Sequence, residues 1–219
     1  TSYKDGNPDV YISDLFYGQE KKLSYYRGLN IAPDWSPDGE KIVLTLSQDD
    51  GNSDIYIINL DGEKISRLTN DWANDVSPSW SPDGEKIAFV SNRSGSPQIY
   101  IMEIKKRKVR RLTFKGRYNT SPAWSPKGDK IAFAGRRDNV FDIYTINTDG
   151  SGLRQLTFNS GGNENPSWSP DGRHIAFTSS RSGSKKIYIM LADGSDERVI
   201  TWGKGNDTDP FWSPYLNYR

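Results

Sequence analysis

The 219-residue chain contains no cysteine and a single histidine, His174. The absence of cysteine excludes disulfides, thiolate nucleophiles, cysteine-ligated zinc and iron–sulfur clusters. One imidazole also excludes histidine-rich metal sites and most histidine-based triads. No apolar run approaches the roughly 18 residues of a membrane span, and the N-terminus shows no basic-then-apolar signal peptide. We therefore expect a chain that does not insert into a membrane.

Net charge is also nearly absent, because 29 Lys and Arg face 28 Asp and Glu, for a net charge of +1. Nucleic-acid binding needs clustered basic charge, so the balance argues against it. Aromatic residues and glycine are abundant instead, with 7 Trp, 12 Tyr and 20 Gly. This composition is typical of short strands and tight turns, and helical periodicity appears nowhere.

Three ladders of residues recur along the chain with the same spacings of 45, 44, 44 and 44. They are Trp35, Trp80, Trp124, Trp168 and Trp212; Tyr11, Tyr56, Tyr100, Tyr144 and Tyr188; and Leu23, Leu68, Leu112, Leu156 and Ile200. A period near 44 residues is that of a four-stranded blade of a β-propeller.

Each repeat predicts four short strands. The first leads into the tryptophan and is followed by a Ser-Pro-Asp-Gly turn, in which Pro presets φ and Gly accepts positive φ. The second is an apolar run such as Ile87-Ala88-Phe89, buried on both faces. The third carries an Ile-Tyr pair, and the fourth ends in Leu-Thr. The serines of the turns and His174, which stands where sister repeats have lysine, are therefore interpreted as scaffold.

The sequence predicts an all-β propeller of five four-stranded blades in one domain spanning residues 1–219, closed by pairing of N- and C-terminal strands. In the closing blade, residues 209–212 supply the first strand, and residues 9–15 and 21–25 the third and fourth. The two ends meet inside the second strand, at residues 216–219 and 1–3. Such closure removes exposed sheet edges and favours a monomer.

The repeat Pro-x-Trp-Ser-Pro-Asp-Gly-x-x-Ile-Ala-Phe, followed by Ile-Tyr and Leu-Thr, resembles the TolB-type (PD40, WD40-like) propeller family. The closing Trp212-Ser213-Pro214-Tyr215-Leu216 is similar to the C-terminal end of that family. The resemblance implies a periplasmic, non-catalytic protein of the Tol–Pal envelope system. The family has an α/β domain ahead of a six-bladed propeller, so the chain is expected to be a natural variant or one trimmed by a domain and a blade. It is then expected to lack the TolA-binding segment.

A proline stands two residues before each tryptophan, and the residues just upstream of it vary from repeat to repeat. Proline belongs at the start or on the edge of a strand, so these residues are predicted to line one rim of the channel. Variation on a repeated frame suits partner recognition. Ile31, Val76 and Tyr118 would be apolar anchors, and the acidic members suggest a basic partner. The candidates are Ile31, Ala32, Asn74, Val76, Ser77, Tyr118, Thr120, Ser121, Glu164, Asn165, Asn206, Thr208 and Asp209.

The resemblance implies that this rim binds a Pal-like peptidoglycan-associated lipoprotein. Two alternatives stay open: a propeller that binds carbohydrate or a small ligand, with lyase-like chemistry at the rim carboxylates, and a structural fragment with no retained partner. No cofactor is predicted. The oxygen-rich residues 49–52 and 206–209 could hold calcium, although backbone turns explain them better. A basic hairpin at residues 105–108 is interpreted as a solvated turn, with contact to anionic lipid headgroups or a second protein as the alternative.

Overall fold

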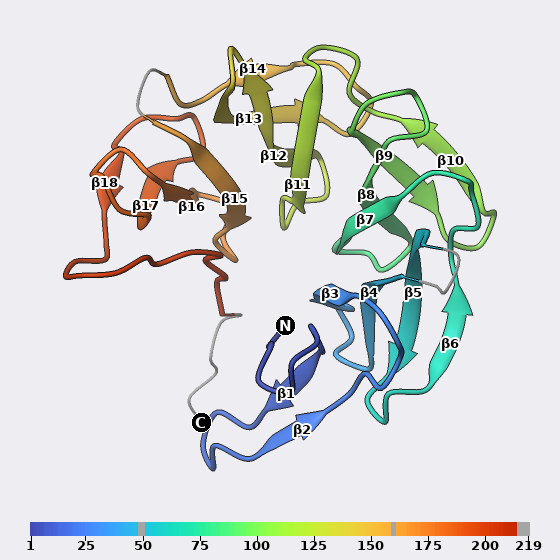
Figure 1. Cartoon of the computed structure of the whole chain (residues 1–219). Coiled ribbons are helices and arrows are strands. Elements are labelled where there is room, and N and C mark those ends of the chain that lie inside the picture. The colour runs from blue at the N-terminus through green and yellow to red at the C-terminus, as the bar shows by residue number, and fades with distance from the viewer. Residues whose placement is uncertain (48–50, 159–160, 214–219) are drawn as a thin grey trace. The chain divides into compact units, whose positions relative to one another are not determined.

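The computed structural model describes residues 1–47, 51–158 and 161–213, and all the regular secondary structure in these residues is β-strand (Figure 1). The all-β prediction is therefore confirmed. In the same residues no helix is long and apolar enough to be a membrane span. The chain forms two compact units, Thr1–Arg110 and Arg111–Arg219, and the prediction of a single domain stays a prediction.

Four sheets each contain four antiparallel strands in consecutive order, the meander expected of propeller blades. Two sheets belong to the N-terminal unit and two to the C-terminal unit (Figure 1). The strands are β3 (Asn30–Trp35), β4 (Lys41–Ser47), β5 (Ser53–Asn59) and β6 (Lys64–Arg67); β7 (Asp75–Trp80), β8 (Lys86–Ser91), β9 (Gln98–Glu103) and β10 (Lys108–Arg111); β11 (Tyr118–Trp124), β12 (Lys130–Arg137), β13 (Val140–Asn147) and β14 (Arg154–Gln155); and β15 (Asn163–Trp168), β16 (His174–Ser179), β17 (Lys186–Leu191) and β18 (Arg198–Val199).

The turn between the first and second strand of each sheet has the predicted geometry. In the first repeat the Gly39 N–H donates to the Ser36 carbonyl at 2.9 Å, and Gly39 has a φ of 74°. The Ser36 hydroxyl donates to Asp38 and accepts the backbone N–H of Lys41. The β7–β10 and β15–β18 sheets repeat these contacts, whereas in the β11–β14 sheet Lys127 replaces the aspartate and the Ser125 hydroxyl donates to Asp129. The serines are therefore structural, as the sequence predicted.

The cores lie between consecutive sheets, built from the predicted apolar second strands. In the N-terminal unit, Val43 and Ile57 of one sheet pack against Ile87 and Phe89 of the next. In the C-terminal unit the equivalent cluster contains Phe177. These second strands are almost wholly inaccessible, so burial of apolar surface holds neighbouring sheets of a unit together.

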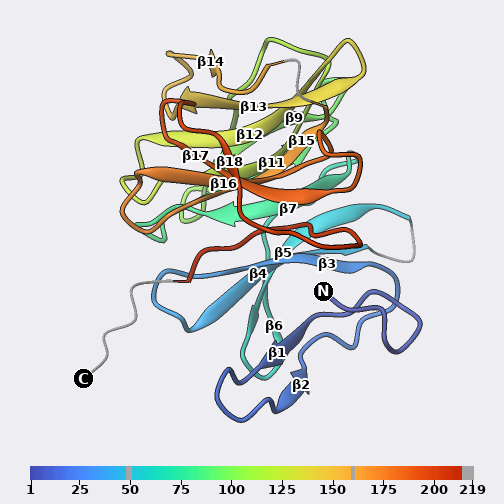
Figure 2. The same ribbon diagram turned by 90° about the vertical axis from the view of Figure 1, so that its left-hand side faces the viewer.

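The prediction of five four-stranded blades closed by N- and C-terminal pairing is wrong. The fifth repeat contributes only a two-stranded sheet, β1 (Tyr11–Ser13) and β2 (Glu20–Lys22), which lies next to the β3–β6 sheet in both views (Figures 1 and 2). Near the N-terminus, Ser2 forms a single bridge with Asp9, and the expected first strand at residues 209–212 is not a strand. Residues 216–219, expected in the second strand, lie outside the described residues.

The sequence of the fifth repeat explains this difference. Its second strand would have to be built from Leu216–Arg219 and Thr1–Tyr3 in place of an Ile-Ala-Phe run. The central strands of the four complete sheets bury fully inaccessible side chains such as Phe89 and Phe177. Without such a central strand, the third and fourth strands of this repeat have no apolar neighbour in their own sheet. A sheet of two strands alone is only marginally stable. Here the sheet is stabilised by Val10 and Leu23, which pack on Leu44 of the neighbouring sheet.

Candidate docking surface

Ten of the thirteen candidate residues lie on the first strand of a complete sheet or on the segment leading into it, and none is fully buried. Asn206, Thr208 and Asp209 lie on the equivalent segment of the fifth repeat, which is not a strand. The residue five positions before each tryptophan behaves differently. In the four complete sheets it is Asn30, Asp75, Asn119 or Asn163, and its exposed fraction is at most 2%. The structure thus separates each predicted segment into one buried polar residue and accessible neighbours.

Left-handed residues mark these segments in each unit, a feature that was not predicted from the sequence. We call these five residues, each standing directly before the repeated proline, the docking row: Ala32, Ser77, Ser121, Asn165 and Asp209. Their φ values lie between 51° and 55°. In the four complete sheets the pairing register shifts at this position, the sign of a β-bulge. A non-glycine residue before proline prefers extended backbone, so each position is held in a conformation that costs about 1–3 kcal/mol.

Hydrogen bonds hold the row in place within each unit. In the C-terminal unit the Ser121 hydroxyl donates to the Asn165 side-chain oxygen at 2.8 Å, and the Asn165 amide donates to Asp209 at 2.5 Å. The Asp209 backbone N–H donates to the Thr178 hydroxyl of the preceding sheet. In the N-terminal unit the Ser77 N–H makes the equivalent bond to Thr45. Three consecutive repeats thereby present one continuous line of hydroxyl, amide and carboxylate groups.

The acidic charge that the sequence placed on this rim is largely paired within the chain. Glu164 lies 3.1 Å from the Lys185 ammonium and Asp207 lies 2.8 Å from that of Lys186. Asp75 is buried against Arg93, as described below. These pairs offset the negative potential expected from the sequence and occupy the carboxylates that a lyase would use.

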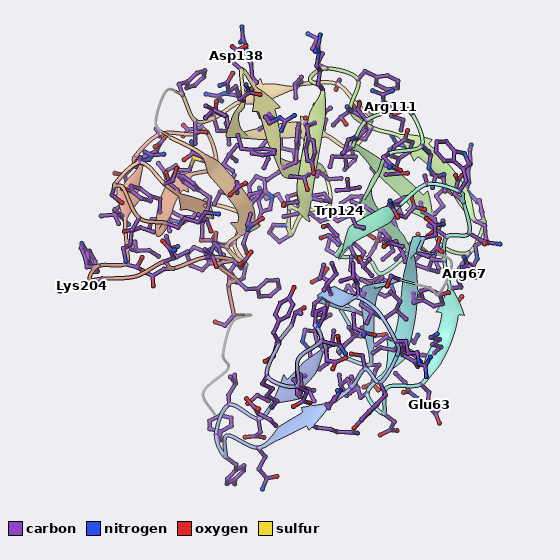
Figure 3. All side chains as sticks on the ribbon, in the orientation of Figure 1. Glu63, Arg67, Arg111, Trp124, Asp138 and Lys204 are labelled. Carbon is purple, nitrogen blue, oxygen red and sulfur yellow. The ribbon has the colours of Figure 1, made fainter. Side chains whose placement is uncertain are left out.

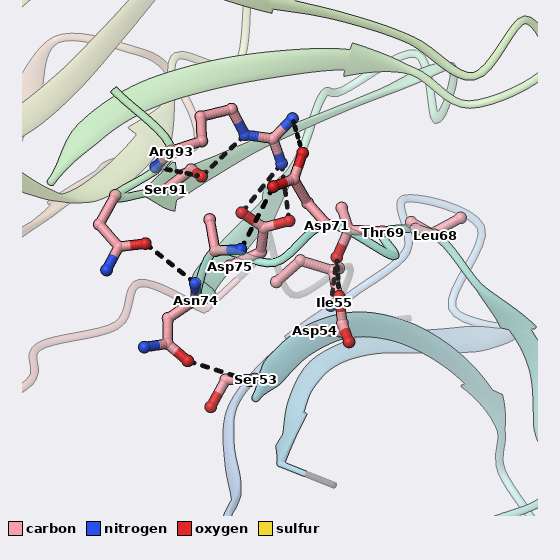
Figure 4. A network of polar contacts seen from close by, with 12 residues as sticks. Ser53, Asp54, Ile55, Leu68, Thr69, Asp71, Asn74, Asp75, Ser91 and Arg93 are labelled. Carbon is pink, nitrogen blue, oxygen red and sulfur yellow. Dashed lines mark hydrogen bonds and ion pairs between the residues drawn. The ribbon is translucent and has the colours of Figure 1, made fainter. Parts of the chain in front are cut away.

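A buried cluster of hydrogen-bonded polar side chains, which we call the clasp, positions these segments against the preceding sheet (Figure 4). In the N-terminal unit it contains Asp54, Arg67, Thr69, Asp75 and Arg93. In the N-terminal unit the wholly buried carboxylate of Asp54 accepts hydrogen bonds from the Thr69 hydroxyl at 3.0 Å and from Arg67 at 2.5 Å. Arg93 donates to both oxygens of Asp75, at 2.8 and 3.0 Å. Burial raises the pKa of Asp75 despite the favourable charge of Arg93. Buried charges of this kind persist only when paired.

Contacts equivalent to those of the clasp, between exchanged residues, are found at Asp9, Asp142 and Lys186. Asn163 donates to Asp142 at 3.2 Å, whereas in the last repeat the donor and acceptor positions are exchanged and Lys186 donates to Asp207. Three ladders with the common spacing carry it: Asp9, Asp54, Gln98, Asp142 and Lys186; Ser24, Thr69, Thr113, Thr157 and Thr201; and Asn30, Asp75, Asn119, Asn163 and Asp207. The common spacing could have identified these three ladders in the sequence. They were not recognised because Asp, Asn, Ser and Thr are also the typical residues of turns.

Asp34 is a half-buried carboxylate in the first repeat, beside the docking row. It accepts the backbone N–H of Trp80 at 2.7 Å, and burial raises its pKa to about 6. The folded state then binds a proton more tightly than the unfolded chain. The group therefore favours folding below pH 4, and this contribution is lost as pH rises through 6.

We expect Asp34→Asn to keep the acceptor and remove the charge. Relative to wild type it should raise the free energy of unfolding by about 1–3 kcal/mol at pH 7.5 and have little effect at pH 4. Urea unfolding at the two pH values measures this difference. Asp61→Asn, on an exposed turn, is the control. An equal effect of Asp34→Asn at both pH values would contradict the assigned pKa.

Exposed aromatic residues follow the Leu-Thr ladder at one repeated position, a second feature that the sequence reading missed. Tyr25, Phe114, Phe158 and Trp202 are between 60% and 77% exposed. They stand on the segments that connect the fourth strand of one repeat to the first strand of the next. Exposed aromatics of this kind are typical contact residues of protein interfaces.

The remaining candidates have structural contacts. The basic hairpin lies between β9 and β10 as predicted, and its Arg107 donates to the carbonyls of Arg67 and Leu68 in the neighbouring sheet. The His174 ring lies against Trp212.

For calcium, residues 49 and 50 lie outside the described part of the chain. Within the described part, no three Asp, Glu, His or Cys residues are grouped to hold a cation. Calcium binding at residues 206–209 stays a prediction.

The family model for the TolB beta propeller domain (PD40) matches residues 1–157 and 119–217 of the chain. The chain belongs to the TolB β-propeller domain family. A curated Tol–Pal system protein TolB from Alcanivorax borkumensis is 49% identical over 49 residues, which is 22% of this chain and 11% of that protein. The chain therefore spans a small part of that relative.

Two solved structures show the likeness over nearly the whole chain. TolB from Acinetobacter baumannii has a TM-score of 0.86 at 30% identity, covering 98% of this chain and 53% of that one. A putative TolB from Agrobacterium tumefaciens has a TM-score of 0.82 at 26% identity, covering 93% and 78%. The chain thus spans about half the length of the Acinetobacter protein. The resemblance inferred from the Pro-x-Trp-Ser-Pro-Asp-Gly repeat is confirmed.

Proposed function

We propose that this TolB-family chain is a non-catalytic docking scaffold of the Tol–Pal type, which acts in the periplasm and binds a Pal-like peptidoglycan-associated lipoprotein. The docking row carries the proposal. The same left-handed geometry is built in every repeat, yet the side chains it presents are alanine, serine, asparagine and aspartate. Strained backbone repeated on a fixed frame with varied side chains is expected of a recognition surface, since strain is retained where function requires it.

Within each unit, the neighbouring residues supply the other parts of an interface. Ile31, Val76 and Tyr118 are half-buried on their strands, and Tyr118 packs edge-on against Phe141 with ring centroids 5.5 Å apart. Exposed polar groups of Asn74, Asn206 and Thr208 flank the strands. An apolar or aromatic centre with a polar rim is typical of protein–protein interfaces. The absence of catalysis is supported by the structural hydrogen bonds of the turn serines and by the paired rim carboxylates.

The partner is tested by calorimetric titration with the purified soluble domain of a Pal-like lipoprotein. We expect binding by the wild-type chain, and a loss of affinity of at least about tenfold for the double variant Tyr118→Ala/Glu164→Arg, because an aromatic anchor is removed and a charge reversed. Lys105→Ala/Lys106→Ala, on the basic hairpin, should leave the affinity unchanged. Circular dichroism confirms that each variant is folded.

No binding by the folded wild-type chain would overturn the proposed partner. Undiminished binding by Tyr118→Ala/Glu164→Arg would place the partner on another surface. Loss of binding only in the lysine variant would favour the basic hairpin as the interface.

A further inference from the structure

A Phe–Tyr pair of rings recurs in three repeats, and in two of them an arginine side chain covers it. In the β7–β10 sheet, the Arg93 guanidinium lies 5.7 Å from the ring centroid of Phe89 and 5.2 Å from that of Tyr100. Its Nε donates to the Ser91 hydroxyl at 2.8 Å, and its terminal nitrogen binds Asp75. The cation–π contacts and the hydrogen bonds fix the side chain over the rings.

The β15–β18 sheet repeats the arrangement. The Arg181 guanidinium lies 5.5 Å from the Phe177 centroid and 4.5 Å from that of Tyr188. Its Nε donates to Ser179 at 2.9 Å and its terminal nitrogen to the side-chain oxygen of Asn163 at 3.1 Å. Arginine is thus the usual cover of this ring pair.

The β11–β14 sheet has the rings but not the cover. Phe133 and Tyr144 stack with centroids 5.6 Å apart, and Arg137 stands at the position of Arg93 and Arg181. Its side chain, however, is 74% exposed and pairs with Asp138 at 3.7 Å. The serine that would anchor it is replaced by Gly135, so the hydroxyl that holds the other two arginines is missing.

The hairpin turn explains the displacement. The chain from phenylalanine to tyrosine has the same length in all three repeats, but β12 continues to Arg137 and β13 begins at Val140. The two residues between them, Asp138 and Asn139, both have positive φ, as a tight type I′ hairpin requires. The longer strands carry Arg137 away from the rings to the tip of the hairpin, where Figure 3 labels Asp138.

A cavity of about 780 Å³ occupies the vacated space. Phe133 and Tyr144 line it together with the amide side chains of Asn119 and Gln155. Gly135 keeps it open, because a Cβ there would lie 2.9 Å from both the Asn119 oxygen and the Tyr144 ring. This volume is within the range of small-molecule sites, which combine aromatic walls with a few polar groups.

The charge around the cavity is strongly positive. Four basic side chains line it, Lys115, Arg117, Arg136 and Arg137, against the single carboxylate of Asp138. A cleft lined by one sign of charge concentrates ligands of the opposite sign. The sister repeats hold a cation against a carboxylate or amide in this position, whereas this repeat surrounds the empty position with cations and therefore favours an anion.

We propose that this cavity is a binding site for an acidic saccharide. The half-buried Tyr144 ring, backed by the buried Phe133, provides an apolar wall for the C–H face of a sugar. The side-chain oxygen of Gln155, whose nitrogen donates to Asp142 and to the Thr157 carbonyl, suits a sugar hydroxyl as an acceptor, and the basic rim suits the carboxylate. Arginine and carboxylate form paired, charge-assisted hydrogen bonds. The site is separate from the docking row and does not depend on the lipoprotein proposal.

The proposal is tested by calorimetry with galacturonic acid oligomers and neutral galactose oligomers of equal length. We expect the acidic oligomers to bind at least about tenfold more tightly, because their carboxylates meet the basic rim. Amide chemical shifts in NMR should change at Gly135 and Asn119. Lys115→Ala/Arg117→Ala should weaken binding about tenfold or more, and Lys105→Ala/Lys106→Ala, with two cations removed elsewhere, should not.

A second variant closes the cavity. Replacing residues 136–141 by the sequence of residues 92–97 rebuilds the turn that docks arginine in the second repeat, and Gly135 is kept because a Cβ there would lie 2.9 Å from Asn119 and Tyr144. We expect this folded variant to lose the acidic oligomer. The proposal is overturned by no binding at about 10 mM ligand, by equal binding of the neutral oligomers, or by retained binding in the closed variant. Benzoate or inorganic phosphate binding as tightly as the oligomers would overturn the saccharide assignment.

Discussion

Asp54→Ala is expected to lower the free energy of unfolding by about 1–3 kcal/mol, the cost of removing a buried acceptor from its donors. The Asp54 side chain is wholly inaccessible, and its loss removes one acceptor of the Arg67 guanidinium and the acceptor of the Thr69 hydroxyl. The same hydroxyl accepts the Ile55 backbone N–H, so the effect reaches the start of the third strand. Urea unfolding monitored by far-ultraviolet circular dichroism measures it.

Asp61→Ala is the matched control, because Asp61 has the same carboxylate on an exposed turn of the same repeat. Its effect should stay within about 0.5 kcal/mol. If Asp54→Ala were as mild as Asp61→Ala, the clasp would be incidental to stability, and the repeated polar ladders would need another explanation.

Lys186→Asp is expected to destabilise the chain by about 3 kcal/mol or more, because it buries a carboxylate against that of Asp207. The double variant Lys186→Asp/Asp207→Asn recreates the pair found at Asp142 and Asn163. Thr201, whose hydroxyl already accepts the Ile187 N–H, stands in the place of Thr157 in that pair. The double variant should therefore recover most of the lost stability.

A double-mutant cycle of the two substitutions measures this coupling. We expect a coupling energy of about 2–3 kcal/mol, near the upper range for contacting residues. Additive effects would show that the residues of the clasp do not act as a pair. Asp207→Asn alone leaves the Lys186 ammonium facing a neutral amide and completes the cycle.

Much of the fold could be predicted because the local sequence of each complete repeat indicates all four of its strands. The Ile-Ala-Phe runs became buried central strands, and the Ser-Pro-Asp-Gly segments became turns with hydroxyl, carboxylate and backbone bonds inside four residues. The fifth repeat failed because regular spacing of Trp212 and Tyr11 does not supply a central strand. Regular spacing predicts the position of a repeat in the sequence. Formation of a four-stranded sheet also requires an apolar central strand, which this repeat lacks.

The site was harder to predict because its defining features depend on neighbouring repeats. Nothing in the residue Ala32 or Ser121 indicates a left-handed backbone, and the following proline argues for the opposite. The conformation is maintained by bonds such as that between Asp209 and Thr178, 31 residues apart. The cavity likewise depends on the turn residues Asp138 and Asn139, which carry Arg137 away from the rings. This effect is recognised only by comparison with the docked arginines of the other repeats.

Hydrogen exchange on the wild-type chain, with and without the soluble domain of a Pal-like lipoprotein, tests the proposed docking surface most directly. The account predicts that binding slows exchange of the backbone amides flanking the docking row, around Ala32, Ser77, Ser121, Asn165 and Asp209, while the hairpin at residues 105–108 is unchanged. Protection confined to that hairpin, or no protection in any segment at saturating partner, would contradict it.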